Sequence, residues 1–276
     1  MKKLNVVEVR QLCKDIRLDV LDMAYRCDGP AHLGGALSIV EILAVLYGSE
    51  MNHLPDNPRW EGRDRFILSK GHGVLSFYSA LYRFGYFDYE KILTFKENGT
   101  DLIAHPVMNM DLGIESSNGS LGHGLSMCVG IAWALRHKNS ESKVFTLIGD
   151  GECDEGSIWE AAMSASRLKL GNLIAIVDCN GFQSDGPVQS DSSSETMREK
   201  WKACGWNTKI INGHSIEELL VAFKSESSNT KLMPTVIIAR TNKGCGISFM
   251  ANNNSWHHNR ITKNNYELAR AEILDE

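Results

Sequence analysis

The sequence predicts an α/β fold, a doubly wound and mostly parallel sheet with helices on both faces. Short apolar segments alternate along the chain with longer segments whose apolar residues recur at helical spacing. The short segments are apolar throughout, which is typical of parallel strands buried on both faces. Glycine-rich segments follow the predicted strands or precede the helices, where ligands bind in sheets of this kind.

The order of these segments defines the expected elements. We expect strands at residues 65–68, 144–148, 173–177, 209–211 and 235–239. We expect helices at residues 6–27, 38–46, 74–84, 121–137, 157–170, 195–204, 216–224 and 265–274. Ser38, followed three residues later by Glu41, predicts a capping box for the second helix. The segments 98–119 and 242–264 are rich in Gly and Asn and are expected to be long loops, which are often functional.

Composition excludes several classes of protein. The 276 residues, 43% hydrophobic and 23% charged, fit one domain spanning residues 1–276 with a sizeable core. A net charge of −5 provides no basic surface for nucleic acid. No apolar run approaches the roughly 20 residues of a membrane helix, so we expect no membrane partner and a cytoplasmic location. Seven scattered cysteines without a Cys-x-x-Cys pair are expected to be free thiols.

Polar residues follow two consecutive predicted strands. Asp150 lies in a Gly-Asp-Gly turn after the strand at 144–148, and Asn180 follows the strand at 173–177. If these strands are neighbours, both side chains point into one crevice. Carboxylate and amide oxygens suit Mg²⁺ or Ca²⁺, and phosphate oxygens and water would complete the coordination. The glycines beside Asp150 and the helix that follows would allow a phosphate to approach the backbone.

The Gly-Asp-Gly turn and Asn180 together resemble the motif of enzymes that use thiamine diphosphate. Three further segments resemble the transketolase family in particular: DRFILSKGH at residues 64–72, GSLGHGLS at 119–126 and GECDEGSIWEA at 151–161. The resemblance covers nearly the whole chain. It implies the thiamine-diphosphate-binding fold, and within it the domain that binds the diphosphate of the cofactor, the PP domain.

The resemblance also implies which residues hold the metal and the cofactor. The metal would be bound by the side chains of Asp150 and Asn180 and by the backbone carbonyl of Phe182. The expected contacts to thiamine diphosphate are His72, Gly122, Gly151, Glu152, Asn180 and His257.

The catalytic residues implied by the resemblance are mostly histidines. His32 and His105 match residues that line the substrate funnel and assist proton transfers, and an imidazole suits this work because its pKa lies near neutrality. His257 is also expected to be catalytic, although the adjacent His258 leaves open which of the two fills the role. Glu155 matches a glutamate at the subunit interface that interacts with a catalytic glutamate of the partner.

A second chain is also expected. In transketolases a further domain binds the aminopyrimidine ring and carries the activating glutamate, and a third domain follows it. Neither matches any part of residues 1–276, so the resemblance implies that the partner is a C-terminal transketolase subunit, in a heterotetramer of two plus two chains. The expected reaction transfers a two-carbon ketol unit from a ketose or ketose phosphate to an aldose or aldose phosphate.

Three alternative functions remain open at this point. The chain could belong to another thiamine enzyme, related to deoxyxylulose-phosphate synthase or to the first component of a 2-oxo-acid dehydrogenase, although segments 69–72 and 121–124 favour transketolase. It could be a non-catalytic scaffold, but a scaffold has no need of Asp150 and Asn180. A Mg²⁺-dependent phosphohydrolase with Asp150 as nucleophile would need a second acid in an Asp-x-Asp pattern, which the sequence does not show.

Overall fold

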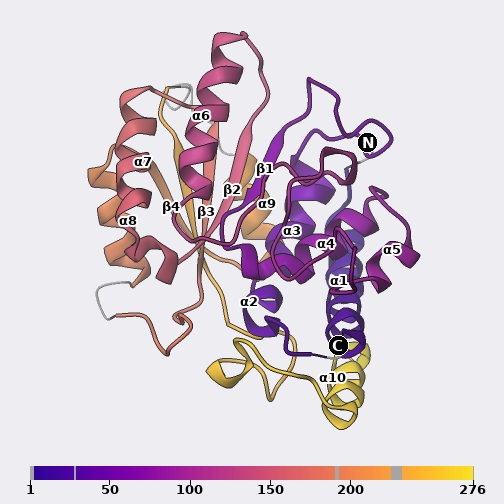
Figure 1. Ribbon diagram of the computed structural model, residues 1–276. Helices are drawn as coiled ribbons and strands as arrows, with labels where there is room; N and C mark the ends of the chain where they lie inside the picture. Colours follow the sequence, from indigo (N-terminus) through magenta and orange to yellow (C-terminus); the bar gives the residue numbers. More distant parts are fainter. Residues whose placement is uncertain (1–2, 28, 190–192, 225–231, 276) are drawn as a thin grey trace.

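A five-stranded parallel sheet forms the centre of the protein in the computed structural model (Figure 1). The structure describes residues 3–27, 29–189, 193–224 and 232–275. The strands are β1 (Arg65–Leu68), β2 (Val144–Gly149), β3 (Leu173–Cys179), β4 (Asn207–Asn212) and β5 (Thr235–Arg240). Their order is β1-β2-β3-β5-β4, and every neighbouring pair is parallel. All the carboxyl ends therefore lie at the same edge of the sheet.

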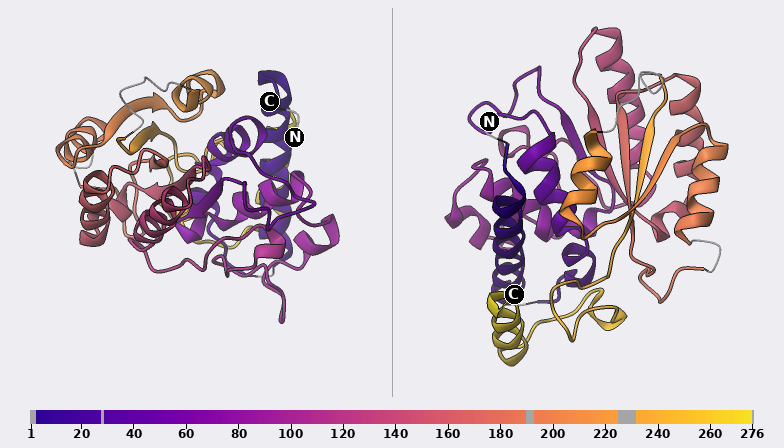
Figure 2. Two further views of the ribbon diagram at one scale, coloured as in Figure 1. Left: turned by 90° about the horizontal axis from the view of Figure 1, so that it is seen from above. Right: turned by 180° about the vertical axis from the view of Figure 1, so that it is seen from behind.

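Helices cover both faces of this sheet. One face carries α6 (Gly124–His137), α7 (Gly156–Arg167) and α8 (Ser194–Ala203). The other carries α1 (Val6–Arg26), α3 (Val40–Val45), α4 (Val74–Arg83) and α9 (Ile216–Lys224). In Figure 1 α6 and α7 lie in front of the strands, whereas α9 lies in front of them in the view from behind (Figure 2).

Successive residues of one strand contribute to different cores, because side chains alternate between the two faces of a sheet. In β1, Phe66 and Leu68 belong to the core beneath α1, α3 and α4, whereas Ile67 belongs to the core beneath α6 and α7. All three side chains are 2% exposed or less. The predicted doubly wound α/β fold is thereby confirmed.

Short elements and loops cluster at the carboxyl ends of the strands. The remaining helices are α2 (Leu33–Leu37), α5 (Tyr89–Leu93) and α10 (Lys263–Asp275), with a π-helical turn at Leu46–Glu50. In the described ranges, 3-10 turns lie at Gly71–Gly73, Met110–Leu112, Gly151–Asp154 and Asn254–Trp256. In Figure 1 α2 and the loop before α10 lie below the strand ends, and α10 packs at the lower end of α1.

The start of α3 contradicts the sequence prediction. In place of one helix with Ser38 as its N-cap, α2 ends just before Ser38 and α3 begins after Ile39, which makes no side-chain cap. The Ser38 hydroxyl donates to Asp178 at 2.7 Å, and Glu41 forms a buried ion pair with Arg17. The predicted capping box is therefore wrong, because both side chains bind residues that are distant in the sequence.

The other predicted strands and helices are confirmed, with differences of a few residues at their ends. The helix predicted from residue 121 begins at Gly124, and the last one begins at Lys263. The short helices α2 and α5 have no counterpart among the predicted elements. All seven cysteines are free, as expected. None of the helices in the described part is both long enough and apolar enough to span a membrane.

A capping box is present at the start of α1, and it generates a stability prediction. The Asn5 side chain accepts hydrogen bonds from the amides of Val7 at 2.9 Å and Glu8 at 3.0 Å, and Glu8 accepts from the Asn5 amide at 2.8 Å. We expect Asn5→Ala to lower the free energy of unfolding by about 1 kcal/mol in urea denaturation. Asn5→Ser should retain most of the stability. Equal stability of the alanine variant and the wild type would contradict the role of this cap.

Candidate active site

A cavity of about 290 Å³ lies where the strands end. Its wall is formed by the turn after β1, the segments after β2 and β3, and the segment after β5. These segments are brought together because all strands of the sheet are parallel. The predicted residues that line the cavity are His72, Asp150, Gly151, Glu152, Glu155, Asn180, Phe182 and His257.

Asp150 and Asn180 lie on one wall of the cavity because β2 and β3 are neighbours in the sheet. The Asp150 carboxylate accepts hydrogen bonds from the backbone amides of Gly151 at 2.8 Å and Gly181 at 2.6 Å. The Asn180 amide accepts at Oδ1 from the backbone amide of Phe182 at 3.0 Å. Both side chains therefore line one cavity, as expected for neighbouring strands.

The Asp150 carboxylate fits a cation. It is only 1% exposed, and no Lys, Arg or His in the described part of the chain lies within ion-pair distance of it. Burial, and then the charge of Asp178, raises the pKa of Asp150 to about 7. A buried carboxylate without a cation is costly, and a divalent ion would remove that cost.

The ligand set of such an ion would contain a single carboxylate. Among the described residues, no three side chains of His, Cys, Asp or Glu form a group that could hold a metal. A metal here would depend on one carboxylate, the Asn180 amide oxygen and a backbone carbonyl, for which Phe182 stays a prediction. Such hard oxygen ligands suit Mg²⁺ or Ca²⁺ when phosphate oxygens and water fill the other positions.

Glu152 is engaged within the protein itself. Its carboxylate accepts from the amides of Gly122 at 2.9 Å and Gly149 at 3.0 Å and from the Ser69 hydroxyl. Gly122 does not line the cavity. It has a φ of +83°, and a Cβ there would meet the hydroxyl of Ser157 at 2.5 Å. Glu152 therefore joins the ends of β1 and β2 to the start of α6, and direct cofactor contacts of Glu152 and Gly122 stay predictions.

Two buried lysines provide positive charge at the cavity. Lys70 pairs with Asp178 at 2.5 Å, and both side chains are at most 1% exposed. Lys243 donates to Asn254 at 2.6 Å and to Nδ1 of His257 at 2.9 Å, and no carboxylate of the described residues pairs with it. Burial and the charge of Lys70 lower the pKa of Lys243 to about 8. The positive charge of Lys243 is therefore available to an anion.

Five imidazoles form a cluster beside the cavity. The ring of His32 lies 5.6 Å from those of His72 and His105, 5.4 Å from that of His257 and 4.3 Å from that of His258. Burial lowers the pKa of His32 to about 3 and that of His257 to about 4. Burial also lowers the pKa values of His72 and His105. These four imidazoles are neutral at pH 7.

The structure separates the two adjacent histidines. His257 lines the cavity and accepts from Lys243, whereas His258 is exposed and packs against His32. Glu155 is exposed at the start of α7 and also lines the cavity. Glu155 and His257 therefore both lie at the cavity, and the catalytic role of each, like the interface contact of Glu155, stays a prediction.

Three further charged residues belong to the site although the sequence motifs assign them no role. Lys70 lies within the segment 64–72, and Asp178 stands two residues before Asn180. Lys243 follows the apolar strand β5, as Asp150 follows β2, and this position after a strand is typical of a residue at a ligand site. The pairing of Lys70 with Asp178, in contrast, joins the turn after β1 to strand β3 and has no local sequence signal.

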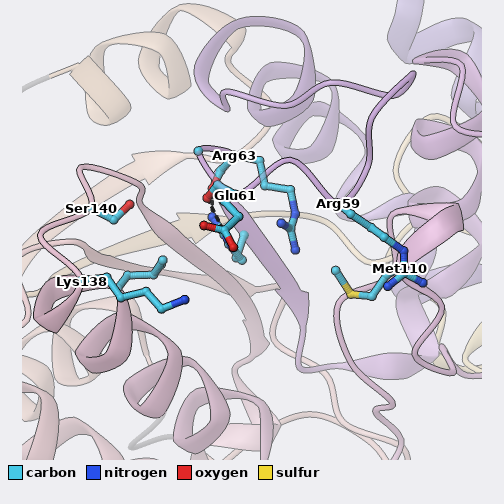
Figure 3. A pocket seen from close by; sticks show the side chains of 9 residues that line it. Arg59, Glu61, Arg63, Met110, Lys138 and Ser140 are labelled. Carbon is cyan, nitrogen blue, oxygen red and sulfur yellow. Dashed lines mark hydrogen bonds between the residues drawn. The ribbon is translucent and has the colours of Figure 1, made fainter.

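A second cavity, of about 440 Å³, lies near the amino end of β1 (Figure 3). Two of its three arginines pair with carboxylates, Arg59 with Asp111 at 2.6 Å and Arg63 with Glu115 at 2.9 Å. Glu61 adds a further carboxylate to the wall. The cavity is thus at the opposite edge of the sheet from the predicted site residues, and Arg65 and Lys138 add positive charge to its wall.

Comparisons with known proteins agree with this geometry. A family model described as "Transketolase, thiamine diphosphate binding domain" matches residues 9–273. The chain is 41% identical over 248 residues to a 6-deoxy-6-sulfo-D-fructose transketolase subunit of Clostridium sp. (strain MSTE9), covering 90% of each chain. It is 39% identical over 259 residues to an apulose-4-phosphate transketolase subunit of Phocaeicola vulgatus, covering 94% of this chain and 91% of the relative.

Longer transketolases match over part of their length. The solved transketolase of Campylobacter jejuni superposes with a TM-score of 0.88 at 28% identity, covering 98% of this chain and 43% of that one. Human transketolase is 36% identical over 249 residues, and the match covers 39% of its length. The chain thus spans about two fifths of the length of these proteins. The chain belongs to the transketolase family, as a counterpart of its thiamine diphosphate binding domain.

Proposed function

We propose that this chain is the diphosphate-binding subunit of a transketolase that depends on thiamine diphosphate and Mg²⁺. The enzyme transfers a two-carbon ketol unit, glycolaldehyde, from a ketose or its phosphate to an aldose or its phosphate. The observation that carries the proposal is the buried Asp150 carboxylate, which has no cation partner among the described residues and shares a cavity wall with Asn180. A cofactor diphosphate with a bound metal satisfies this arrangement.

Different residues of the cavity would bind the metal and the diphosphate. Asp150, the amide oxygen of Asn180 and the carbonyl of Phe182 would hold the metal. Lys243 and His72 would contact the diphosphate from other walls of the same cavity. Bound thiamine diphosphate would supply a nucleophilic carbon, chemistry that no protein side chain provides. The role of this chain is therefore to fix the diphosphate end of the cofactor and to handle protons around the substrate.

The imidazole cluster suits the handling of protons. Neutral imidazoles both donate and accept, and the lowered pKa values of His32 and His257 keep them neutral at pH 7. His32 and His105, whose rings lie 5.6 Å apart, would take and return the protons of sugar hydroxyl groups. Because His32 is surrounded by four other imidazoles, a charge on any one of them would oppose a charge on His32.

A partner subunit completes the proposal. Residues 1–276 form the PP domain, and the pyrimidine-binding and C-terminal domains belong to a second chain, in a heterotetramer of two plus two. The surface for this partner is the outer face of α6 and α7, beside Glu155. It exposes Gly130, Trp133 at 45% and Met163 at 55%. Apolar and small residues with little charge are typical of the core of a stable protein interface.

The substrate class follows from the relatives in a general way only. Two similar subunits are named for 6-deoxy-6-sulfo-D-fructose and for apulose-4-phosphate. We propose that the sugar donor of this chain also carries an anionic group. A cytoplasmic location stays a prediction.

A screen of ketose donors, with turnover that requires thiamine diphosphate, Mg²⁺ and the partner subunit, tests the activity. Turnover without thiamine diphosphate would contradict it, and complete absence of turnover would favour a scaffold role.

The metal proposal predicts the effect of one isosteric substitution. With the partner subunit present, Asp150→Asn should weaken Mg²⁺-dependent binding of thiamine diphosphate at least tenfold, because the charged metal ligand is lost. Isothermal titration calorimetry measures this. Asp154→Asn is the matched control, since Asp154 also lines the cavity but is exposed and needs no cation. Equal losses in both variants would show that only the overall charge matters.

The interface proposal predicts that a bulky charge on α6 blocks association. A Cβ at Gly130 meets nothing within 4 Å, so Gly130→Arg should fold normally while its side chain extends from the surface. Binding of the C-terminal subunit, measured by analytical ultracentrifugation, should weaken more than tenfold. Val221→Arg on α9, at a site 67% exposed on the other face of the sheet, is the control. Unchanged association of the Gly130 variant would place the interface elsewhere.

The imidazole cluster predicts a loss of stability in mild acid. An unfolded histidine takes up a proton near pH 6.5, but folded His32 does so only near pH 3. Between these values the unfolded chain binds more protons, so the free energy of unfolding falls as the pH falls from about 6.5. In urea unfolding between pH 7 and pH 5, the free energy of unfolding of His32→Asn should fall less steeply with pH than that of the wild type. The difference in slope corresponds to the uptake of up to about one proton. An identical pH dependence in both proteins would contradict the lowered pKa of His32.

A further inference from the structure

We propose that Asp178 is a positioning residue that fixes the Asn180 amide with its oxygen, and not its nitrogen, available to a divalent metal. The inference rests on the proposed metal site and adds a residue that does not touch the metal. Asp178 is fully buried in β3, beside Gly149 of β2 and Ala239 of β5 in the register of the sheet. It therefore lies beneath the floor of the cavity.

Four donors from four parts of the chain converge on the Asp178 carboxylate. Oδ2 accepts from Lys70 at 2.5 Å, from Ser38 at 2.7 Å and from Nδ2 of Asn180 at 2.7 Å, and Oδ1 accepts from the Thr241 hydroxyl. The donors come from the ends of β1, α2, β3 and β5. Because the carboxylate is surrounded in this way, its position is fixed by the sheet itself.

The contacts of Asn180 allow only one orientation of its amide. The nitrogen donates to Asp178, and the oxygen accepts from the backbone amide of Phe182 at 3.0 Å. A reversed amide would place its oxygen against the Asp178 carboxylate and its nitrogen against another donor, and both contacts are repulsive. The amide oxygen has a second lone pair, which remains for a cation.

The same strand end also holds the other proposed ligand. The backbone amide of Asp150 donates to the carbonyl of Asp178 at 3.2 Å, and the Asp150 carboxylate accepts from Gly181 at 2.6 Å. The end of β3 thus sets the distance between Asp150 and Asn180, while the Asp178 side chain sets which atom of Asn180 faces the site. Groups that orient metal ligands in this way typically change metal affinity by 10–100-fold when they are replaced.

The test measures Mn²⁺ affinity by electron paramagnetic resonance, with the wild-type chain and its partner in the presence of thiamine diphosphate. Asp178→Asn should weaken Mn²⁺ binding by about 10–100-fold per folded molecule, because an amide at 178 no longer dictates the orientation of Asn180. The double variant Asp178→Asn with Asn180→Asp should recover most of the affinity. A carboxylate at 180 presents two equivalent oxygens, so its orientation has no effect, whereas a purely structural defect at 178 would not be rescued.

The control is Thr241→Val, which removes a different donor to Asp178 and leaves Asn180 untouched. It should change the Mn²⁺ affinity less than twofold. Affinity of Asp178→Asn within twofold of the wild type would overturn the positioning role while the metal site stands. Absence of Mn²⁺ binding to the wild type would overturn the proposed metal site, and the positioning role with it.

A measurement on the wild-type protein keeps the inference testable if Asp178→Asn does not fold. The side-chain amide protons of Asn180 should exchange with deuterated water at least a hundredfold more slowly than those of the exposed Asn252, because one of them is donated to a buried carboxylate. Nuclear magnetic resonance of the side-chain amides gives both rates. Exchange at similar rates would show that the contact does not hold Asn180 in place.

Discussion

The buried ion pair between Lys70 and Asp178 is the contact around which the functional edge of the sheet is organised. Two charges that are at most 1% exposed are tolerated only when they pair and when hydrogen bonds occupy their remaining sites. The carbonyl of Gly35 and the hydroxyl groups of Ser38 and Thr241 fill those sites. Satisfying this one pair therefore brings four separate segments into a fixed arrangement at the floor of the cavity.

The cavity above this pair has an uneven distribution of charge that matches a metal–diphosphate ligand. Asp150 is a buried carboxyl group without a cation among the described residues, and Lys243 has a positive charge without a carboxylate there. The two groups do not neutralise each other directly. A diphosphate with a divalent ion presents both signs of charge, so one ligand can compensate both residues, and the neutral imidazoles nearby add no opposing charge.

The outer face of α6 and α7 exposes apolar side chains. Most apolar residues of α6 and α7 pack against the sheet, but Trp133 and Met163 face outward together with the unshielded Gly130. This face adjoins Glu155 at the cavity, so a partner that covers the helices also reaches the site. The relatives of similar length are named as transketolase subunits, which agrees with a site that is completed by a second chain.

The sequence by itself determined the strands and most helices, and it placed Asp150 and Asn180 at the ends of two strands, because apolar runs are local signals and parallel strands end at one edge. Only the structure decided that these two strands are neighbours. The sequence did not determine what Ser38, Glu41, Lys70 and Asp178 do. Ser38 and Glu41 have the spacing of a capping box, yet their partners are Asp178 and Arg17, and Lys70 is neutralised from another strand. Only the tertiary structure decided these contacts, because a buried polar group binds whichever partner the fold places beside it, and sequence spacing contains no record of that partner.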